Sequence, residues 1–261
     1  MLEEPTRVQP PVEAGEIPHV SHTSIACSTL RIAPSTTRGA LGFHDYALGV
    51  FPEREAARVR ELFAKLEREI ELVLVLGPEE TPFPGARDID FAGEAQKLVE
   101  GLAELGDLVS ARVTEEPELG IARFPAIAVL ADGEDTRIRY YGLPWGYELS
   151  SLVGAVVEAG RPESSLHHTS LALLDGLERD VAIDVFVTPT CPHCPPAVLL
   201  AYRAALASPR VTAAAIEATE FPSLADAMDV YSVPAVVIGG VPRYDGAVPE
   251  GVFFRRLLEY A

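Results

Sequence analysis

The sequence predicts an α/β protein of two tandem units, each with a central mixed sheet flanked by helices. Three observations predict this class. Apolar residues alternate between a period of three to four, typical of helices, and short continuous runs, typical of buried strands. The same order of elements occurs twice along the chain. Short motifs also match between the halves: Phe124-Pro125-Ala126 matches Val233-Pro234-Ala235, and Tyr141-Gly142-Leu143-Pro144 matches Asp245-Gly246-Ala247-Val248-Pro249.

The first unit is assigned to residues 50–162 and follows an extension, residues 1–49, that is rich in Pro, Ser, Thr and His and is expected to be partly ordered. Apolar residues at helical spacing open the unit, and the run Leu72-Val73-Leu74-Val75-Leu76 follows as a buried strand. The expected elements are a helix over 59–70, a strand over 72–76, a helix over 93–105, strands over 108–113, 126–130 and 136–141, and a helix over 146–159.

The second unit is assigned to residues 163–261 and repeats this order after the polar linker at 161–165. Its expected elements are a helix over 171–177, a strand over 181–187, a helix over 196–207, a strand over 211–218, a helix over 222–229, strands over 235–239 and 242–244, and a helix over 250–260.

Charge and hydropathy exclude several function classes. The chain has 21 basic and 39 acidic residues and a net charge of -18, which disfavours binding to nucleic acids or anionic membranes. No apolar run approaches the ~18 residues of a membrane span. The acidic start Met1-Leu2-Glu3-Glu4-Pro5 lacks the features of a secretory signal, so we expect a cytoplasmic protein whose three cysteines are held in a reducing environment.

Cys191-Pro192-His193-Cys194 follows a predicted strand and precedes a predicted helix. At the start of a helix the unpaired N–H groups and the positive helix end stabilise a thiolate, and cysteines in such motifs have pKa values of roughly 3.5–7.5. We therefore expect Cys191 to attack a partner disulfide and Cys194 to resolve the mixed disulfide. Pro192 and His193 are expected to tune the thiolate, His193 by favouring it when protonated.

Two other interpretations of this pair are weaker. A zinc site needs about four ligands, and the chain has no second Cys pair, so no metal site is predicted here. A permanent structural disulfide across a two-residue spacer closes too short a loop to stabilise the fold much. The third thiol, Cys27, lies near His19, His22 and His44, but their spacing fits no zinc pattern well.

The order strand, Cys191-Pro192-His193-Cys194, helix, strand, then Val233-Pro234 before another strand resembles a thioredoxin fold. With the duplication, residues 50–261 resemble the protein disulfide oxidoreductases of thermophiles, glutaredoxin-like proteins with two fused thioredoxin-like folds. The resemblance implies a cis proline at Pro234 beside the redox pair. It also implies a partner-binding rim formed by Thr190, Val233, Pro234 and Gly246, where an extended segment could pair with the Val233 backbone.

Two features remain open. Glu217 and Glu220 lie near a strand end, where a solvated carboxylate is the favoured interpretation and a proton relay, by Glu217 above all, is the alternative. The first unit has Thr81-Pro82-Phe83-Pro84 where the family usually has a second Cys pair, so it has no thiol for exchange there. A role in binding a partner's chain and a purely structural role are equally open for this unit.

We expect a protein-disulfide oxidoreductase with no bound cofactor. The chain lacks a Gly-rich dinucleotide fingerprint, so its redox-active disulfide should be reduced in trans by a flavin-dependent, thioredoxin-reductase-like protein. An alternative within this class is a domain that reduces a peroxiredoxin, because the N-terminal domain of the alkyl hydroperoxide reductase flavoprotein is also a double thioredoxin fold with one active pair. An alternative of another class is a substrate-binding or chaperone-like module that uses the thiol-free first unit.

Overall fold

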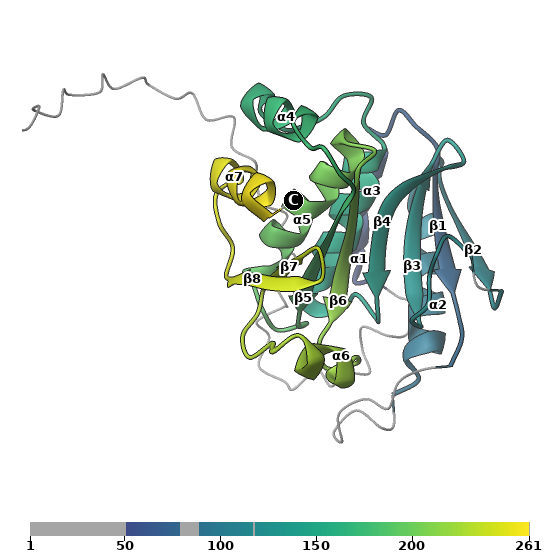
Figure 1. Cartoon of the computed structure of the whole chain (residues 1–261). Helices are drawn as coiled ribbons and strands as arrows, with labels where there is room; N and C mark the ends of the chain where they lie inside the picture. The colour runs from purple at the N-terminus through teal and green to yellow at the C-terminus, as the bar shows by residue number, and fades with distance from the viewer. Residues whose placement is uncertain (1–50, 79–88, 117, 261) are drawn as a thin grey trace, which may run out of the picture.

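The computed structural model describes residues 51–78, 89–116 and 118–260 (Figure 1). The extension predicted over residues 1–49, with Cys27, and the segment Thr81-Pro82-Phe83-Pro84 lie outside the described residues. In the described ranges no helix is long and apolar enough to cross a membrane.

Eight strands form one continuous sheet in the order β2-β1-β3-β4-β6-β5-β7-β8. The strands are β1 (Ile70–Val75), β2 (Val109–Thr114), β3 (Ala126–Ala131), β4 (Glu134–Tyr141), β5 (Val181–Val187), β6 (Val211–Glu217), β7 (Ala235–Ile238) and β8 (Val241–Asp245). Strands β1–β4 belong to the first unit and β5–β8 to the second. Strand β4 pairs in parallel with β6, with Ile138 opposite Ala213 and Tyr141 opposite Ile216. The mixed sheets expected for the two units are therefore joined edge to edge into one sheet.

Most helices lie on one face of this sheet and cover the main hydrophobic core (Figure 1). They are α1 (Glu53–Phe63), α2 (Phe91–Ala103), α3 (Leu149–Ala159), α4 (His168–Asp175), α5 (Cys194–Ala207) and α7 (Glu250–Tyr260), and a short 3-10 helix, η2 (Gly146–Glu148), precedes α3. The short helix α6 (Pro222–Ala227) packs on the opposite face against Phe186 and Ile216.

Alternation along β6 shows how the sequence assigns side chains to the two faces. Ala213 and Ala215 face the main core, whereas Ala214 and Ile216 face α6. Successive side chains of a strand point to opposite faces, so Glu217, at the end of β6, lies on the same side as Ala213 and Ala215. This side of the sheet also carries α5 and the two cysteines, Cys191 and Cys194.

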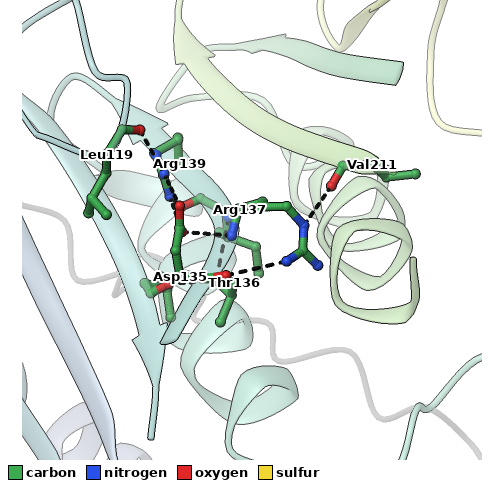
Figure 2. A network of polar contacts seen from close by, with 8 residues as sticks. Leu119, Asp135, Thr136, Arg137, Arg139 and Val211 are labelled. Atoms are coloured by element: carbon green, nitrogen blue, oxygen red, sulfur yellow. Dashed lines mark hydrogen bonds and ion pairs between the residues drawn. The ribbon is translucent and has the colours of Figure 1, made fainter. Parts of the chain in front are cut away.

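An arginine of the first unit forms hydrogen bonds across the seam between the units, that is, the junction where β4 pairs with β6. Arg137 on β4 donates hydrogen bonds to the carbonyl oxygens of Val211 (3.1 Å), Ala205 (2.5 Å) and Ser208 (3.5 Å) in the second unit. Figure 2 shows its side chain reaching from β4 to Val211. A cation at the carboxyl end of α5 satisfies carbonyl groups that have no partner within the helix and complements the helix dipole.

A second arginine on β4 stays within the first unit. The guanidinium of Arg139 donates to both carboxylate oxygens of Asp135, at 2.8 and 2.6 Å, and to the carbonyl oxygen of Leu119 at 3.0 Å (Figure 2). The residue is only 9% exposed, and pairing compensates for burying its charge. The two arginines therefore stiffen the strand that joins the two halves of the sheet.

Several element boundaries differ from the sequence prediction by a few residues, and two of these differences have a clear physical reason. The helix expected to run to residue 70 ends at Phe63, because Ile70 is instead the first residue of β1, where it pairs with Val109 and Ala131. The periodic apolar residues beyond Phe63 therefore reflect burial in the connecting turn and strand. Helix α5 begins two residues earlier than expected, at Cys194, with Pro195 in its first turn, where a missing N–H costs no hydrogen bond.

Candidate redox site

The two cysteines lie on a turn between β5 and α5, and neither forms a disulfide. The N–H of Cys191 donates to the carbonyl oxygen of Thr188 at 3.1 Å, and the N–H of Cys194 donates to that of Cys191 at 3.4 Å. Cys191 is partly exposed, whereas Cys194 is wholly buried beneath it at the first residue of α5. Of these two thiols, Cys191 is therefore the one that can meet a large partner directly.

Of the predicted rim residues, Val233 lies against the Cys191 sulfur. Its Sγ lies 3.5 Å from the carbonyl oxygen of Val233, and the Val233–Pro234 peptide bond is cis, as the resemblance implied. Gly246 is in the left-handed region at φ +86°, and its N–H donates to the carbonyl oxygen of Pro234 at 2.7 Å. The structure thus brings these residues together beside Cys191. The remaining predicted residues, Thr190, Pro192 and His193, are exposed on the turn.

Burial raises the pKa of the Cys194 thiol well above its ordinary value. A hydrogen bond with Cys191 and the negative charge of Glu148 raise it further. Cys194 therefore remains a thiol at neutral pH unless a nearby base accepts its proton. The site must supply that base if Cys194 is to attack a disulfide.

Glu148 is a residue that the sequence did not reveal as part of this site. It ends η2 in the first unit, is 0% exposed, and accepts a hydrogen bond of 2.8 Å from the Ser151 hydroxyl. Burial raises the pKa of Glu148 to about 8. The hydrogen bond from Ser151 lowers this pKa, and the negative charge of Glu217 raises it. In the sequence it looks like an ordinary acidic residue at a helix start, and only the packing of one unit on the other places it near Cys194.

The first unit also holds the backbone of the redox loop. The N–H of Tyr147 donates to the carbonyl oxygen of Pro189 at 2.9 Å. Gly146, in the left-handed region at φ +60°, lies so close that a Cβ atom there would be 2.4 Å from the same oxygen. Only glycine fits this position, and the approach brings Glu148 to Cys194.

The interpretation of Glu217 and Glu220 as solvated carboxylates is wrong, because both are buried, at 0% and 5% exposure. Glu217 accepts hydrogen bonds from the Thr219 hydroxyl at 2.6 Å and from the Glu220 N–H at 2.8 Å. Burial raises the pKa of Glu217 to about 7 despite these bonds. Glu220 accepts from the Leu143 N–H at 2.8 Å and so joins the second unit to the first.

Across the ranges that the structure describes, no group of three or more His, Cys, Asp or Glu side chains is arranged to hold a metal ion.

Sequence comparisons find similarity to thioredoxin-like proteins, most clearly in the second half of the chain. Residues 181–259 match the thioredoxin domain family. The AhpF protein of alkyl hydroperoxide reductase in Xanthomonas campestris pv. phaseoli is 31% identical over 153 residues, which are 58% of this chain and 28% of that protein. The corresponding protein of Staphylococcus epidermidis is 27% identical over 183 residues, 70% of this chain and 33% of that protein. The chain thus spans about a third or less of the length of these curated relatives.

Solved structures agree over most of the chain. The NTD_N/C domain of the alkylhydroperoxide reductase AhpF of Enterococcus faecalis superposes with a TM-score of 0.71 at 26% identity, covering 80% of this chain and all of that chain. A protein disulfide oxidoreductase of Aeropyrum pernix superposes with a TM-score of 0.69 at 27% identity, covering 79% and 92%. Residues 181–259 thus match the thioredoxin domain family, and most of the chain has the same tandem thioredoxin-like fold as these two solved structures.

Proposed function

We propose that the protein exchanges disulfides with protein substrates through Cys191 and Cys194. The observation that carries this proposal is the arrangement of a reachable thiol at Cys191 over a wholly buried thiol at Cys194, beside the Val233 carbonyl. An extended substrate segment would pair with the backbone at Val233 and present its disulfide to Cys191.

In the reductive direction, the Cys191 thiolate attacks one sulfur of the substrate disulfide. A bond forms between Cys191 and that sulfur, and the other substrate sulfur leaves as a thiolate that takes a proton from solvent. Cys194 then attacks the Cys191 sulfur, and the substrate sulfur that was bonded to Cys191 leaves as a thiolate. The substrate disulfide gains two electrons, and the protein's dithiol loses them as the Cys191–Cys194 disulfide forms.

Glu148 is the group placed to take the Cys194 proton during the second attack. Its carboxyl is buried near Cys194, and its pKa of about 8 makes it a stronger base than an ordinary glutamate. The first unit has no thiol pair of its own in this scheme, but it supplies the acid–base group of the second unit. The two units, divided at residues 162/163, thus form a single redox site.

Insulin reduction with dithiothreitol as electron donor tests the assignment. Cys191→Ser should abolish the activity above the uncatalysed rate, and Cys194→Ser should accumulate a mixed disulfide at Cys191 that mass spectrometry detects. Full insulin reduction by Cys191→Ser would refute the proposal.

A second candidate function is electron transfer from a flavoprotein to a peroxiredoxin. It is favoured by the likeness to the AhpF proteins of alkyl hydroperoxide reductase, in which this fold covers all of the NTD_N/C domain. The flavin-dependent reductase would then act in trans and keep the Cys191–Cys194 disulfide reduced. A coupled assay with a thioredoxin-reductase-like flavoprotein, NADPH and the peroxiredoxin of the same cell tests this, and absence of peroxide turnover removes the candidate.

A chaperone-like activity of the first unit is separable from exchange. The double variant Cys191→Ser/Cys194→Ser would still suppress aggregation of a denatured client if the first unit bound it. Loss of suppression in that variant would leave thiol exchange as the activity.

We place thiol exchange and the chaperone-like activity in the cytoplasm, where reducing conditions return the Cys191–Cys194 pair to its dithiol form. Fractionation of cells that express the tagged chain tests the location.

A further inference from the structure

A cavity of about 450 Å³ lies across the seam between the units, within the size range of small-molecule sites. Strands β4, β6 and β5 form its floor, and the loop before β3 and helix α6 form its sides. Ala214 and Ile216 on this floor point away from α5 and the two cysteines, so the cavity opens on the other face of the sheet. Both units line it: Arg123, Arg139 and Tyr141 from the first, and Asp184, Phe186 and Leu224 from the second.

The cavity is a trough because small side chains lie in the middle of its floor. Arg139 on β4 is opposite Ala214 on β6, which is opposite Asp184 on β5. Neighbouring strands lie about 4.8 Å apart, so the backbones of Arg139 and Asp184 stand about 10 Å apart on either side of this alanine. The next row, toward α6, consists of larger and less polar side chains: Tyr141, Ile216 and Phe186. The trough thus has a charged middle and an apolar end.

Asp184 is a carboxylate in the interior of the sheet, between Ala214 on β6 and Val237 on β7. Among the residues that the structure describes, none forms a hydrogen bond or an ion pair with this carboxylate. Burial raises its pKa to about 6, and the charge of Arg123 opposes this rise. At neutral pH the group is therefore ionised and half-buried without a direct partner, which is an unfavourable state for a charge.

The arginines of the cavity differ in whether they already have an acceptor. The guanidinium of Arg139 is engaged by both carboxylate oxygens of Asp135 (Figure 2). Arg123 is exposed, and within the described ranges its guanidinium has no hydrogen bond or ion pair. Its charge acts on Asp184 and on Tyr141. Arg123 therefore shares the cavity with the Asp184 carboxylate without pairing with it.

We propose that this cavity binds a small zwitterion with an apolar side group, such as an apolar amino acid, whose ammonium group pairs with Asp184 and whose carboxylate pairs with Arg123. A carboxylate and a guanidinium that share one space without pairing are complementary to a molecule that carries both charges. The apolar group of the ligand lies at the α6 end, against Ile216, Leu224 and Met228. This site is separate from the thiols, so it does not depend on the proposed thiol exchange.

Simpler ligands match these walls less well. An anion would be attracted by Arg123 but would place a second negative charge beside Asp184, and a cation would be repelled by Arg123. A purely apolar molecule would bury both charged side chains without giving either a partner, which is unfavourable. A zwitterion provides an opposite charge for each.

Three related probes test which charges the cavity recognises. L-Phenylalanine carries both groups, 3-phenylpropionate lacks the ammonium, and phenethylamine lacks the carboxylate, while all of them share the phenyl group. Isothermal titration calorimetry on the full chain should show that L-phenylalanine binds and that each analogue binds about tenfold more weakly or worse, because it loses a charge-assisted hydrogen bond. L-Phenylalanine should also raise the midpoint of thermal unfolding, because it binds the folded state.

Two charge variants assign the contacts. Asp184→Asn should weaken the binding of L-phenylalanine by about tenfold and remove its advantage over 3-phenylpropionate. Arg123→Gln should weaken binding similarly and remove the advantage over phenethylamine. Ala182→Leu is an independent variant, because Ala182 lies on the exposed part of the floor and a longer side chain there fills the trough while both charges remain. It should weaken the binding of all three probes.

Asp180→Asn is the matched control. Asp180 directly precedes β5 and pairs at 3.5 Å with Arg210, and its side chain is 88% exposed. This variant should bind L-phenylalanine as the native protein does. Absence of L-phenylalanine binding to the native protein, equal binding of the three probes, or native-like binding by both charge variants overturns the inference. An equal loss of binding in Asp180→Asn would also contradict it, because that change lies outside the cavity.

Discussion

The backbone N–H of Tyr147 in the first unit donates a 2.9 Å hydrogen bond to the carbonyl oxygen of Pro189, in the loop that carries the redox pair of the second unit. The next residue, Glu148, is thereby held as a buried carboxyl near Cys194. A unit without a recognisable thiol pair thus contributes to the proposed redox site of its neighbour, so substitutions in the first unit should change thiol exchange at the second.

Glu148→Gln should slow the second, Cys194-dependent phase of the dithiobis-nitrobenzoate reaction by about 10²-fold or more, because the proton of the buried thiol loses its acceptor. The first phase, which depends on Cys191, should change little. Stopped-flow absorbance above pH 8, where the Glu148 carboxyl is ionised, measures in one trace the first thionitrobenzoate released by Cys191 and the second released by Cys194. Equal slowing of both phases would point to a general disturbance of the loop and would contradict the assigned role.

Stability should fall as pH rises from about 4.5 to about 8. The folded protein holds a proton on Glu148 up to pH about 8 and on Glu217 up to about 7, whereas both carboxyls lose it near 4.5 once unfolded. The native state binds more protons across this window, so the free energy of unfolding decreases with pH. Urea unfolding at pH 5 and pH 8 should show this loss, and Glu148→Gln should reduce it by a few kcal/mol. A native protein equally stable at both pH values would contradict the raised pKa values.

Gly146→Ala should impair both folding stability and thiol exchange. The new Cβ would lie 2.4 Å from the Pro189 carbonyl oxygen, and the φ of +60° is itself unfavourable for alanine. We expect a loss of more than about 1 kcal/mol together with a slower Cys194 step, as Tyr147 and Glu148 move away from the redox loop. Gly133→Ala is the matched control: its φ is +79°, but nothing lies within 4 Å of its Cβ position. It should cost the backbone strain alone and leave exchange intact.

Arg137→Ala should destabilise the seam between the units by about 1.5–3 kcal/mol, because carbonyl oxygens of Ala205, Ser208 and Val211 lose a charged donor. Arg137→Lys should recover part of this loss, since a single ammonium group cannot reproduce the spread of the guanidinium donors. Denaturant unfolding monitored by circular dichroism measures both variants. A native-like midpoint for Arg137→Ala would show that the other contacts between the units, such as β4–β6 pairing and the Leu143–Glu220 hydrogen bond, hold the seam without Arg137.

The residues of the candidate site were predictable from the sequence where they follow from a local pattern. Cys191 and Cys194 lie where a strand is followed by a helix, and Pro234 directly precedes a strand in a motif that repeats in the first unit. The strand parity of Glu217 was also visible, since it shares a face with Ala213 and Ala215. Its burial was not, because a strand end in sequence gives no sign of what covers it.

Periodicity and spacing along the chain were enough to predict the two-unit α/β order and a Cys-x-x-Cys pair between a strand and a helix, and the family resemblance pointed to Thr81-Pro82-Phe83-Pro84 as the place of an absent second pair. The folded arrangement was needed to learn that the two sheets join through β4 and β6, and that Glu148 lies near the thiol of the other unit. Contacts between units depend on how two surfaces pack, and no local pattern in either unit encodes the position of the other. The pKa of the Cys194 thiol follows from that packing, because in a low-dielectric interior the charge of Glu148, a residue far away in sequence, acts on the thiol with little screening.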